Sequence, residues 1–141
     1  MSLSILLVED SPTDAAILMA AFEEIGYENQ IEVANNGLVA IETLEAIAQA
    51  PDKEMPKLIL LDLNLPRKGG LEVLKAIKQN SVWKKIPTVV FSSSSSQADI
   101  DSSYCCHANA YLCKPRELSE YRMIVQRLHS FWVETAELPS L

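Results

Sequence analysis

The segment Lys57-Leu-Ile-Leu-Leu-Asp62 is a short aliphatic run that ends on a carboxylate. A second run of this kind, Leu3-Ser-Ile-Leu-Leu-Val8, is followed directly by Glu9 and Asp10. Runs that stay apolar at successive positions are typical of strands buried on both faces, as in a parallel sheet. Both segments are therefore predicted to be inner strands that present acidic side chains at their carboxyl ends.

Helical patterns alternate with strand patterns along the rest of the chain. Ser11 and Pro12 supply an N-cap and a first helical residue, and Gly26 ends that helix. The other predicted strands cover 30–34, 87–91 and 109–113, and the other predicted helices follow Gly37, follow Gly70, lie around 97–104 and cover 118–132. This alternation predicts an α/β fold of the flavodoxin-like kind, a three-layer sandwich with a five-stranded parallel sheet in the order 2-1-3-4-5 and five helices.

Length, charge and cysteine content narrow the class of protein. The 141 residues suit one domain, and we expect it to cover 1–132 with a C-terminal tail at 133–141. A net charge of −7 without clustered basic residues argues against nucleic-acid binding. No apolar run approaches the roughly 20 residues of a membrane span, and no signal-peptide pattern opens the chain. The odd number of cysteines (Cys105, Cys106 and Cys113) favours a reducing compartment, so a cytoplasmic location is expected.

The predicted topology gathers chemically active side chains at one edge of the sheet. In a doubly wound sheet ligands bind at the carboxyl ends of the strands, where Glu9, Asp10 and Asp62 would meet. Carboxylates packed together repel one another unless a cation relieves them, and oxygen ligands suit Mg²⁺. Ser92 and Lys114 follow the fourth and fifth strands, and a hydroxyl with an ammonium suits a phosphoryl group. Asp62 could then accept a phosphoryl group.

Four segments carry a resemblance to a known family, in the right order along the chain. They are Val8-Glu9-Asp10, Leu60-Leu-Asp-Leu-Asn-Leu-Pro66, Ser92 after its strand, and Ala110-Tyr-Leu-Cys-Lys-Pro115. These segments resemble the marker segments of response-regulator receivers, and the resemblance covers about Leu3 to Trp132. It implies a single-domain response regulator of a two-component phosphorelay, which catalyses only its own phosphorylation and dephosphorylation and is no enzyme in the metabolic sense.

The resemblance also implies a role for each site residue. Asp62 would be the phosphoacceptor, and Glu9 with Asp10 would be the acidic pair that binds Mg²⁺. The backbone carbonyl of Asn64 would complete the metal ligands. The remaining positions would be the switch hydroxyl Ser92, the switch aromatic Tyr111, and the phosphate-binding Lys114 followed by a cis peptide at Pro115.

Loop and tail sequences resemble one branch of the family more closely. The loop before Lys57, the segment Asn64-Leu-Pro-Arg-Lys-Gly-Gly70 and the tail from Phe131 to Pro139 are similar to the small regulators of cyanobacterial and bacterial phytochrome kinases. The resemblance thus implies a sensor histidine kinase of the phytochrome type as partner.

The last predicted helix has more apolar surface than packing against one sheet requires. One stripe holds Leu118, Tyr121, Val125, Leu128 and Trp132, and Ile124 and Phe131 widen it. Surplus apolar surface marks an interaction site, so we expect a homodimer through the fourth helix, fifth strand and fifth helix. The alternative is a tail that folds back and covers Phe131 and Trp132.

Three other functions compete with the receiver interpretation. An FMN-binding electron carrier needs a phosphate-cradling loop rich in Ser, Thr and Gly, whereas Glu9-Asp10-Ser11-Pro12 would repel phosphate. An aspartate-nucleophile phosphatase needs a second acid where Asn64 stands. A phosphorylation-silent interaction module is the alternative that the sequence separates least well from a working receiver.

Overall fold

The structure of the protein is a computed structural model that describes residues 4–27 and 30–141. In chain order its elements are β1 (Ile5–Val8), α1 (Pro12–Glu24), β2 (Ile31–Ala34), α2 (Gly37–Ala48), β3 (Leu58–Leu61), α3 (Gly70–Gln79), a 3₁₀ turn (Trp83–Lys85), β4 (Thr88–Ser92), α4 (Gln97–Cys105), β5 (Ala110–Cys113), α5 (Leu118–Leu128) and a π-helical segment (His129–Thr135). Within these two ranges, no helix combines the length and the apolar character that crossing a membrane requires.

All strand pairs are parallel, and the sheet has the order β2-β1-β3-β4-β5. The predicted flavodoxin-like fold is therefore confirmed. Val8 pairs with Ala34 on one side and with Leu61 on the other, so β1 and β3 end at the same level. Leu3, the first residue of the predicted β1, lies outside the described residues.

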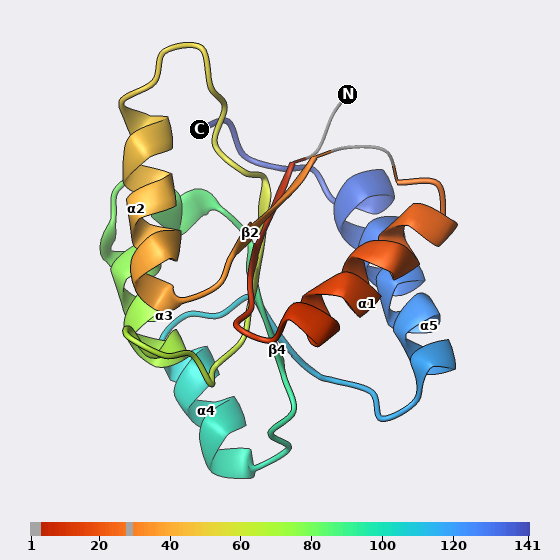
Figure 1. Cartoon of the computed structure of the whole chain (residues 1–141). Helices are drawn as coiled ribbons and strands as arrows, with labels where there is room; N and C mark the ends of the chain where they lie inside the picture. The colour runs from red at the N-terminus through yellow and green to blue at the C-terminus, as the bar shows by residue number, and fades with distance from the viewer. Residues whose placement is uncertain (1–3, 28–29) are drawn as a thin grey trace.

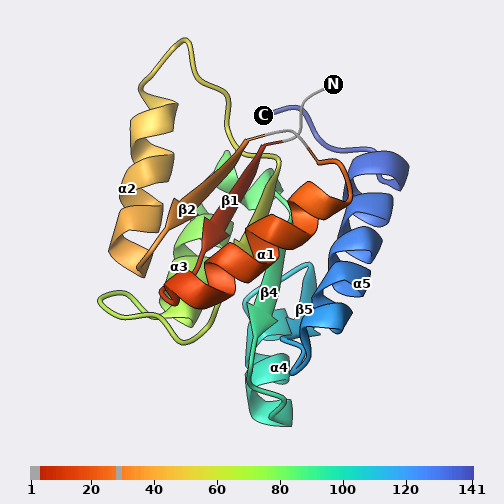
Figure 2. The same ribbon diagram turned by 45° about the vertical axis from the view of Figure 1, so that its right-hand side comes forward.

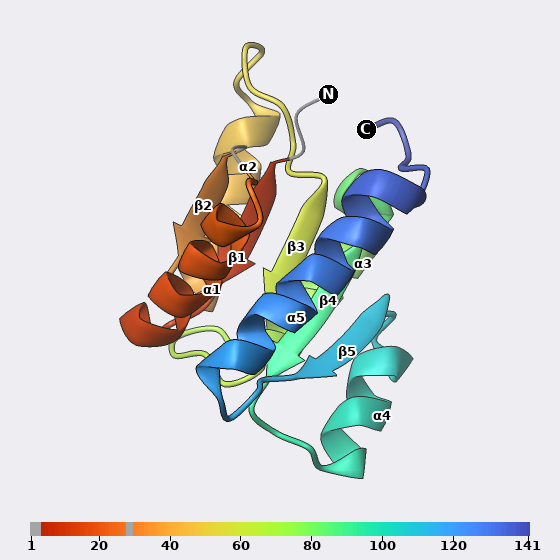
Figure 3. The same ribbon diagram turned by 90° about the vertical axis from the view of Figure 1, so that its right-hand side faces the viewer.

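Helices cover both faces of the sheet. In Figure 3, α1 and α5 lie side by side in front of the strands, and α2, α3 and α4 lie behind them. Figure 1 shows the same sandwich edge on, with α2 to α4 on the left and α1 and α5 on the right. The connections that place these helices bring the carboxyl ends of the strands to one edge of the molecule (Figure 2).

Alternate residues of β1 pack into two separate hydrophobic cores. Ile5 and Leu7 pack into the core under α1 and α5, whereas Leu6 and Val8 pack into the core under α2 and α3. All four side chains are at most 2% exposed. Complete burial on both faces explains why β1 is uniformly apolar, because each such side chain contributes about 1.5–3 kcal/mol when removed from water.

The sequence signals for helix ends act as predicted. The Ser11 hydroxyl accepts a hydrogen bond from the Asp14 N–H (3.2 Å) at the start of α1. At the start of α2, Asn36 supplies a cap that was not predicted, by accepting from the Val39 N–H (2.9 Å). Gly26 follows α1 with a φ of +83°, a backbone conformation that glycine adopts without steric cost.

The C-terminal helix differs from its predicted range. Its α-helical part ends at Leu128, and a wider π-helical segment continues to Thr135. Trp132 and Val133 pack against the core on the α1 and α5 side, but Phe131 remains 52% exposed. The tail therefore does not cover Phe131, and the alternative prediction of a covering tail is wrong for that residue.

Candidate functional site

Three carboxylates meet where β1 and β3 end. One oxygen from each of Glu9, Asp10 and Asp62 lies within 4.8 Å of the other two. Glu9 and Asp62 are buried, and Asp10 is exposed. We call these residues the acidic trio. Their hard oxygen ligands fit a divalent cation such as Mg²⁺, and the exposed Asp10 leaves the site open to solvent.

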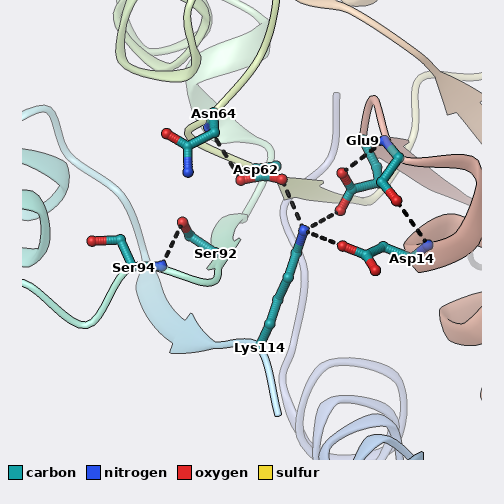
Figure 4. Close-up of polar contacts among 8 residues, drawn as sticks. Glu9, Asp14, Asp62, Asn64, Ser92, Ser94 and Lys114 are labelled. Carbon is teal, nitrogen blue, oxygen red and sulfur yellow. Dashed lines mark hydrogen bonds and ion pairs between the residues drawn. The ribbon is translucent and has the colours of Figure 1, made fainter. Parts of the chain in front are cut away.

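Lys114 extends from the end of β5 into the acidic trio. Its Nζ lies 2.5 Å from Glu9 Oε1 and 2.8 Å from Asp62 Oδ2. A third carboxylate, Asp14 from the first turn of α1, lies 2.9 Å away. Figure 4 shows the ammonium group between these three side chains. The Lys114 backbone N–H donates to the Ser92 carbonyl (2.7 Å), which fixes the lysine next to β4.

For both Glu9 and Lys114, burial and the contacts between Lys114 and the carboxylates shift the pKa in opposite directions. Burial raises the pKa of Glu9 to about 7, although the hydrogen bond with Lys114 opposes this rise, and the nearby Asp62 charge adds to it. Burial alone would lower the pKa of Lys114. Hydrogen bonds to Asp62, Glu9 and Asp14 outweigh that effect and raise this pKa overall. Lys114 is therefore an ammonium that partly neutralises the carboxylates around it.

The loop after β3 holds Asp62 from one side. The Asn64 N–H donates to Asp62 Oδ1 (3.1 Å), and the Gly70 N–H donates to the Leu63 carbonyl (3.1 Å). A Cβ on Gly70 would lie only 2.4 Å from Leu63 Cα and 2.5 Å from the Asp62 carbonyl oxygen. Only glycine permits this close approach, and so α3 begins directly against the backbone of Asp62.

Ser92 and Tyr111 are joined through the loop that follows β4. Ser92 is fully buried, and its hydroxyl accepts from the Ser94 N–H (3.2 Å). The half-buried Tyr111 donates from its hydroxyl to the Ser94 carbonyl (2.8 Å). In Figure 4 the Ser92 side chain points toward the loop that holds Asp62 and Asn64. Both predicted switch residues are therefore hydrogen-bonded to the backbone of Ser94.

The peptide bond between Lys114 and Pro115 is trans, so the predicted cis peptide is wrong. The trans form of an X–Pro bond is the more stable one by about 0.5–1 kcal/mol. A trans bond is compatible with the hydrogen bond that ties Lys114 to Ser92.

Two residues of the site were missed at the sequence level. Asp14 lies in the first turn of α1, and its partner Lys114 is 100 positions away. Ser94 lies within the run of serines from 92 to 96, so nothing in the sequence distinguishes it from its neighbours. The signal for Asp14 was available in principle, because a carboxylate one turn into a helix that starts beside the trio lies close to it.

The parallel sheet, with the acidic trio and the buried Lys114 side chain at its carboxyl edge, is the arrangement expected of a receiver domain. Comparison with known proteins agrees, since residues 5–126 match the response regulator receiver domain. The chain belongs to this family.

The relatives narrow the class further. The response regulator Rcp1 of Synechocystis sp. is 41% identical over 136 residues, covering 96% of this chain and 92% of Rcp1. The crystal structure of the Mn²⁺-bound form of Rcp1 is similar, with a TM-score of 0.87 and 40% identity over 98% of this chain and 99% of the chain in that crystal structure. The phosphorylated cyanobacterial phytochrome response regulator RcpA gives a TM-score of 0.92 and 38% identity over 99% and 100%. The protein is a two-component receiver homologous to phytochrome response regulators, which confirms the family and the branch expected from the sequence.

Proposed function

We propose that Asp62 accepts a phosphoryl group from a sensor histidine kinase, beside a Mg²⁺ ion held by the acidic trio and the Asn64 backbone carbonyl. The observation that carries this proposal is the position of Lys114, whose Nζ lies 2.8 Å from Asp62 Oδ2 among buried carboxylates. Mg²⁺, when bound, supplies charge that offsets the transferred phosphoryl oxygens.

The chain's own residues perform the remaining chemistry. A carboxylate oxygen of Asp62 attacks the phosphorus of a kinase phosphohistidine, forming an O–P bond while the N–P bond breaks and its electron pair returns to the imidazole. Lys114 pairs its positive charge with the transferred oxygens. Hydrolysis of the aspartyl phosphate returns Asp62 to the carboxylate, so the protein acts only on itself.

The signal leaves the site through Ser92 and Tyr111. A phosphoryl group on Asp62 accepts a hydrogen bond from the Ser92 hydroxyl and draws that side chain away from the Ser94 N–H, from which it now accepts. Release of Ser94 alters the loop that also holds the Tyr111 hydroxyl. The surface formed by α4, β5 and α5 changes as a result.

Three further parts of the proposal concern partners and location. The kinase is of the phytochrome type, as supported by the similarity to Rcp1 and to the phytochrome response regulator RcpA. The protein forms a homodimer through α4, β5 and α5, which the exposed apolar residues of α5 support. A cytoplasmic location agrees with three free cysteines, Cys105, Cys106 and Cys113. Residues 1–132 then form the receiver and 133–141 its tail.

Intact mass after incubation with a small phosphoryl donor and Mg²⁺ tests the central step. We expect one phosphoryl adduct that requires Mg²⁺ and is lost in Asp62→Asn. No adduct, under conditions that label another receiver, would favour the phosphorylation-silent interaction module. Transfer from a purified phytochrome-type kinase, compared with an unrelated histidine kinase, then tests the choice of partner.

A further inference from the structure

Asp14 contacts the functional lysine from outside the acidic trio. Its Oδ2 lies 2.9 Å from Lys114 Nζ, while its backbone N–H is capped by Ser11. The Asp14 side chain is 34% exposed, whereas the Lys114 side chain is 7% exposed. Asp14 therefore forms the solvent side of the site, and Lys114 lies between it and the buried carboxylates.

The ammonium of Lys114 has no hydrogen-bond donor to spare. A lysine ammonium has three N–H donors, and Nζ contacts three carboxylates, those of Glu9, Asp14 and Asp62. Two of these acceptors, Glu9 and Asp62, also belong to the acidic trio, which can hold a metal ion. Lys114 and a divalent cation thus compete for the same two side chains. Asp14 also contacts Lys114 but does not belong to the acidic trio, so it takes no part in this competition.

We propose that Asp14 is a positioning residue that retains the Lys114 ammonium on the α1 side of the site and so frees Glu9 and Asp62 for a divalent cation. The inference rests on the metal site of the proposed function. Without Asp14, Lys114 pairs more strongly with the two buried carboxylates, and its charge opposes cation entry more. The loss of one negative charge acts in the same direction, so Asp14→Asn weakens Mg²⁺ binding.

Calorimetric titration with Mg²⁺ tests this role, at a pH above 7 where Glu9 is ionised. Asp14→Asn should lower the Mg²⁺ affinity by about threefold to tenfold, the size of coupling between contacting residues of one network. Asp14→Glu, which keeps the negative charge, should retain part of the Mg²⁺ affinity that Asp14→Asn loses. Asp52→Asn makes the same chemical change at an exposed loop position and should leave the affinity unchanged.

A double-mutant cycle separates positioning from simple charge. In the background of Lys114→Met, Asp14→Asn should change Mg²⁺ affinity by less than about twofold, because the partly exposed Asp14 charge then acts on the cation only through solvent, where salt screens it. An equal loss in both backgrounds would overturn the inference and assign the effect to charge alone. Absence of Mg²⁺ binding by the unaltered protein would instead overturn the proposed metal site itself. Unfolding curves of each variant confirm that the folded protein is measured.

Discussion

At the scale of single residues, Glu9 links the stability of the fold to pH. Its pKa in the folded protein is raised from 4.5 to about 7 because burial disfavours the carboxylate. A raised pKa means that the folded state favours the protonated form. This stabilisation is fully present below pH 4.5 and is lost as the pH rises through 7, by up to about 3 kcal/mol.

Urea unfolding at several pH values, with divalent cations removed, measures this effect. We expect the free energy of unfolding to fall between pH 4.5 and 7. Glu9→Gln should flatten that fall, since glutamine does not ionise. Added Mg²⁺ should restore stability above pH 7, because the cation binds the ionised site. A flat profile in the unaltered protein would contradict the raised pKa.

Gly70 is a second residue on which the site depends. Gly70→Ala would force the backbone of Asp62 and Leu63 away, because the added Cβ would lie 2.4–2.5 Å from backbone atoms. We expect a loss of about 1–3 kcal/mol in stability and slower labelling of Asp62. Gly69→Ala is the matched control, since its Cβ would meet only Glu72 Oε1 at 3.9 Å. Equal effects of both substitutions on unfolding and on adduct formation would disprove the packing argument.

At the scale of elements, α4 is attached to the site mainly by polar contacts. Only Ser103 of this helix is buried, so apolar packing holds α4 weakly. The Ser94 hydroxyl donates to Asp99 Oδ2 in the first turn of α4, and the Ser94 N–H donates to Ser92. One residue thus joins the switch hydroxyl to the start of the helix.

Ser94→Ala removes the link to α4 and keeps the backbone contacts. We expect faster amide hydrogen exchange in α4 and a loss of about 1.5–3 kcal/mol, typical for a hydrogen bond to a charged group. Ser95→Ala, at an exposed position of the same serine run, should change neither quantity. Unaltered exchange in Ser94→Ala would mean that packing alone holds the helix.

At the scale of the whole molecule, α5 and the π-helical segment that follows it (His129–Thr135) present two different surfaces. Tyr121, Val125 and Leu128 are buried in the core, whereas Leu118, Met123 and Phe131 are 68%, 49% and 52% exposed. Exposed apolar groups of this size suit an interface between two copies of the chain, as proposed above.

Phe131→Glu should therefore shift the protein toward the monomer without unfolding it. Sedimentation at several protein concentrations, with and without the phosphoryl donor, measures the association. Leu141→Glu places the same charge on an exposed apolar residue of the tail and should leave the association intact. A monomer at high concentration in both phosphorylation states would eliminate the homodimer.

The sequence by itself determined the fold and the members of the acidic trio. Uniformly apolar strands, capping residues and acidic strand ends are local features, and the order of parallel strands follows from the alternation with helices. The choice of Glu9, Asp10, Asp62 and Lys114 needed only the rule that parallel strands end at one edge.

Tertiary structure alone decided which of these groups touch. Contacts such as Asp14 with Lys114 join side chains 100 positions apart, and no local pattern encodes a distance of 2.9 Å. The exposure of Phe131 likewise depends on neighbours that are remote in sequence. Local propensities select elements, whereas contacts between side chains arise only when packing fixes the elements against one another.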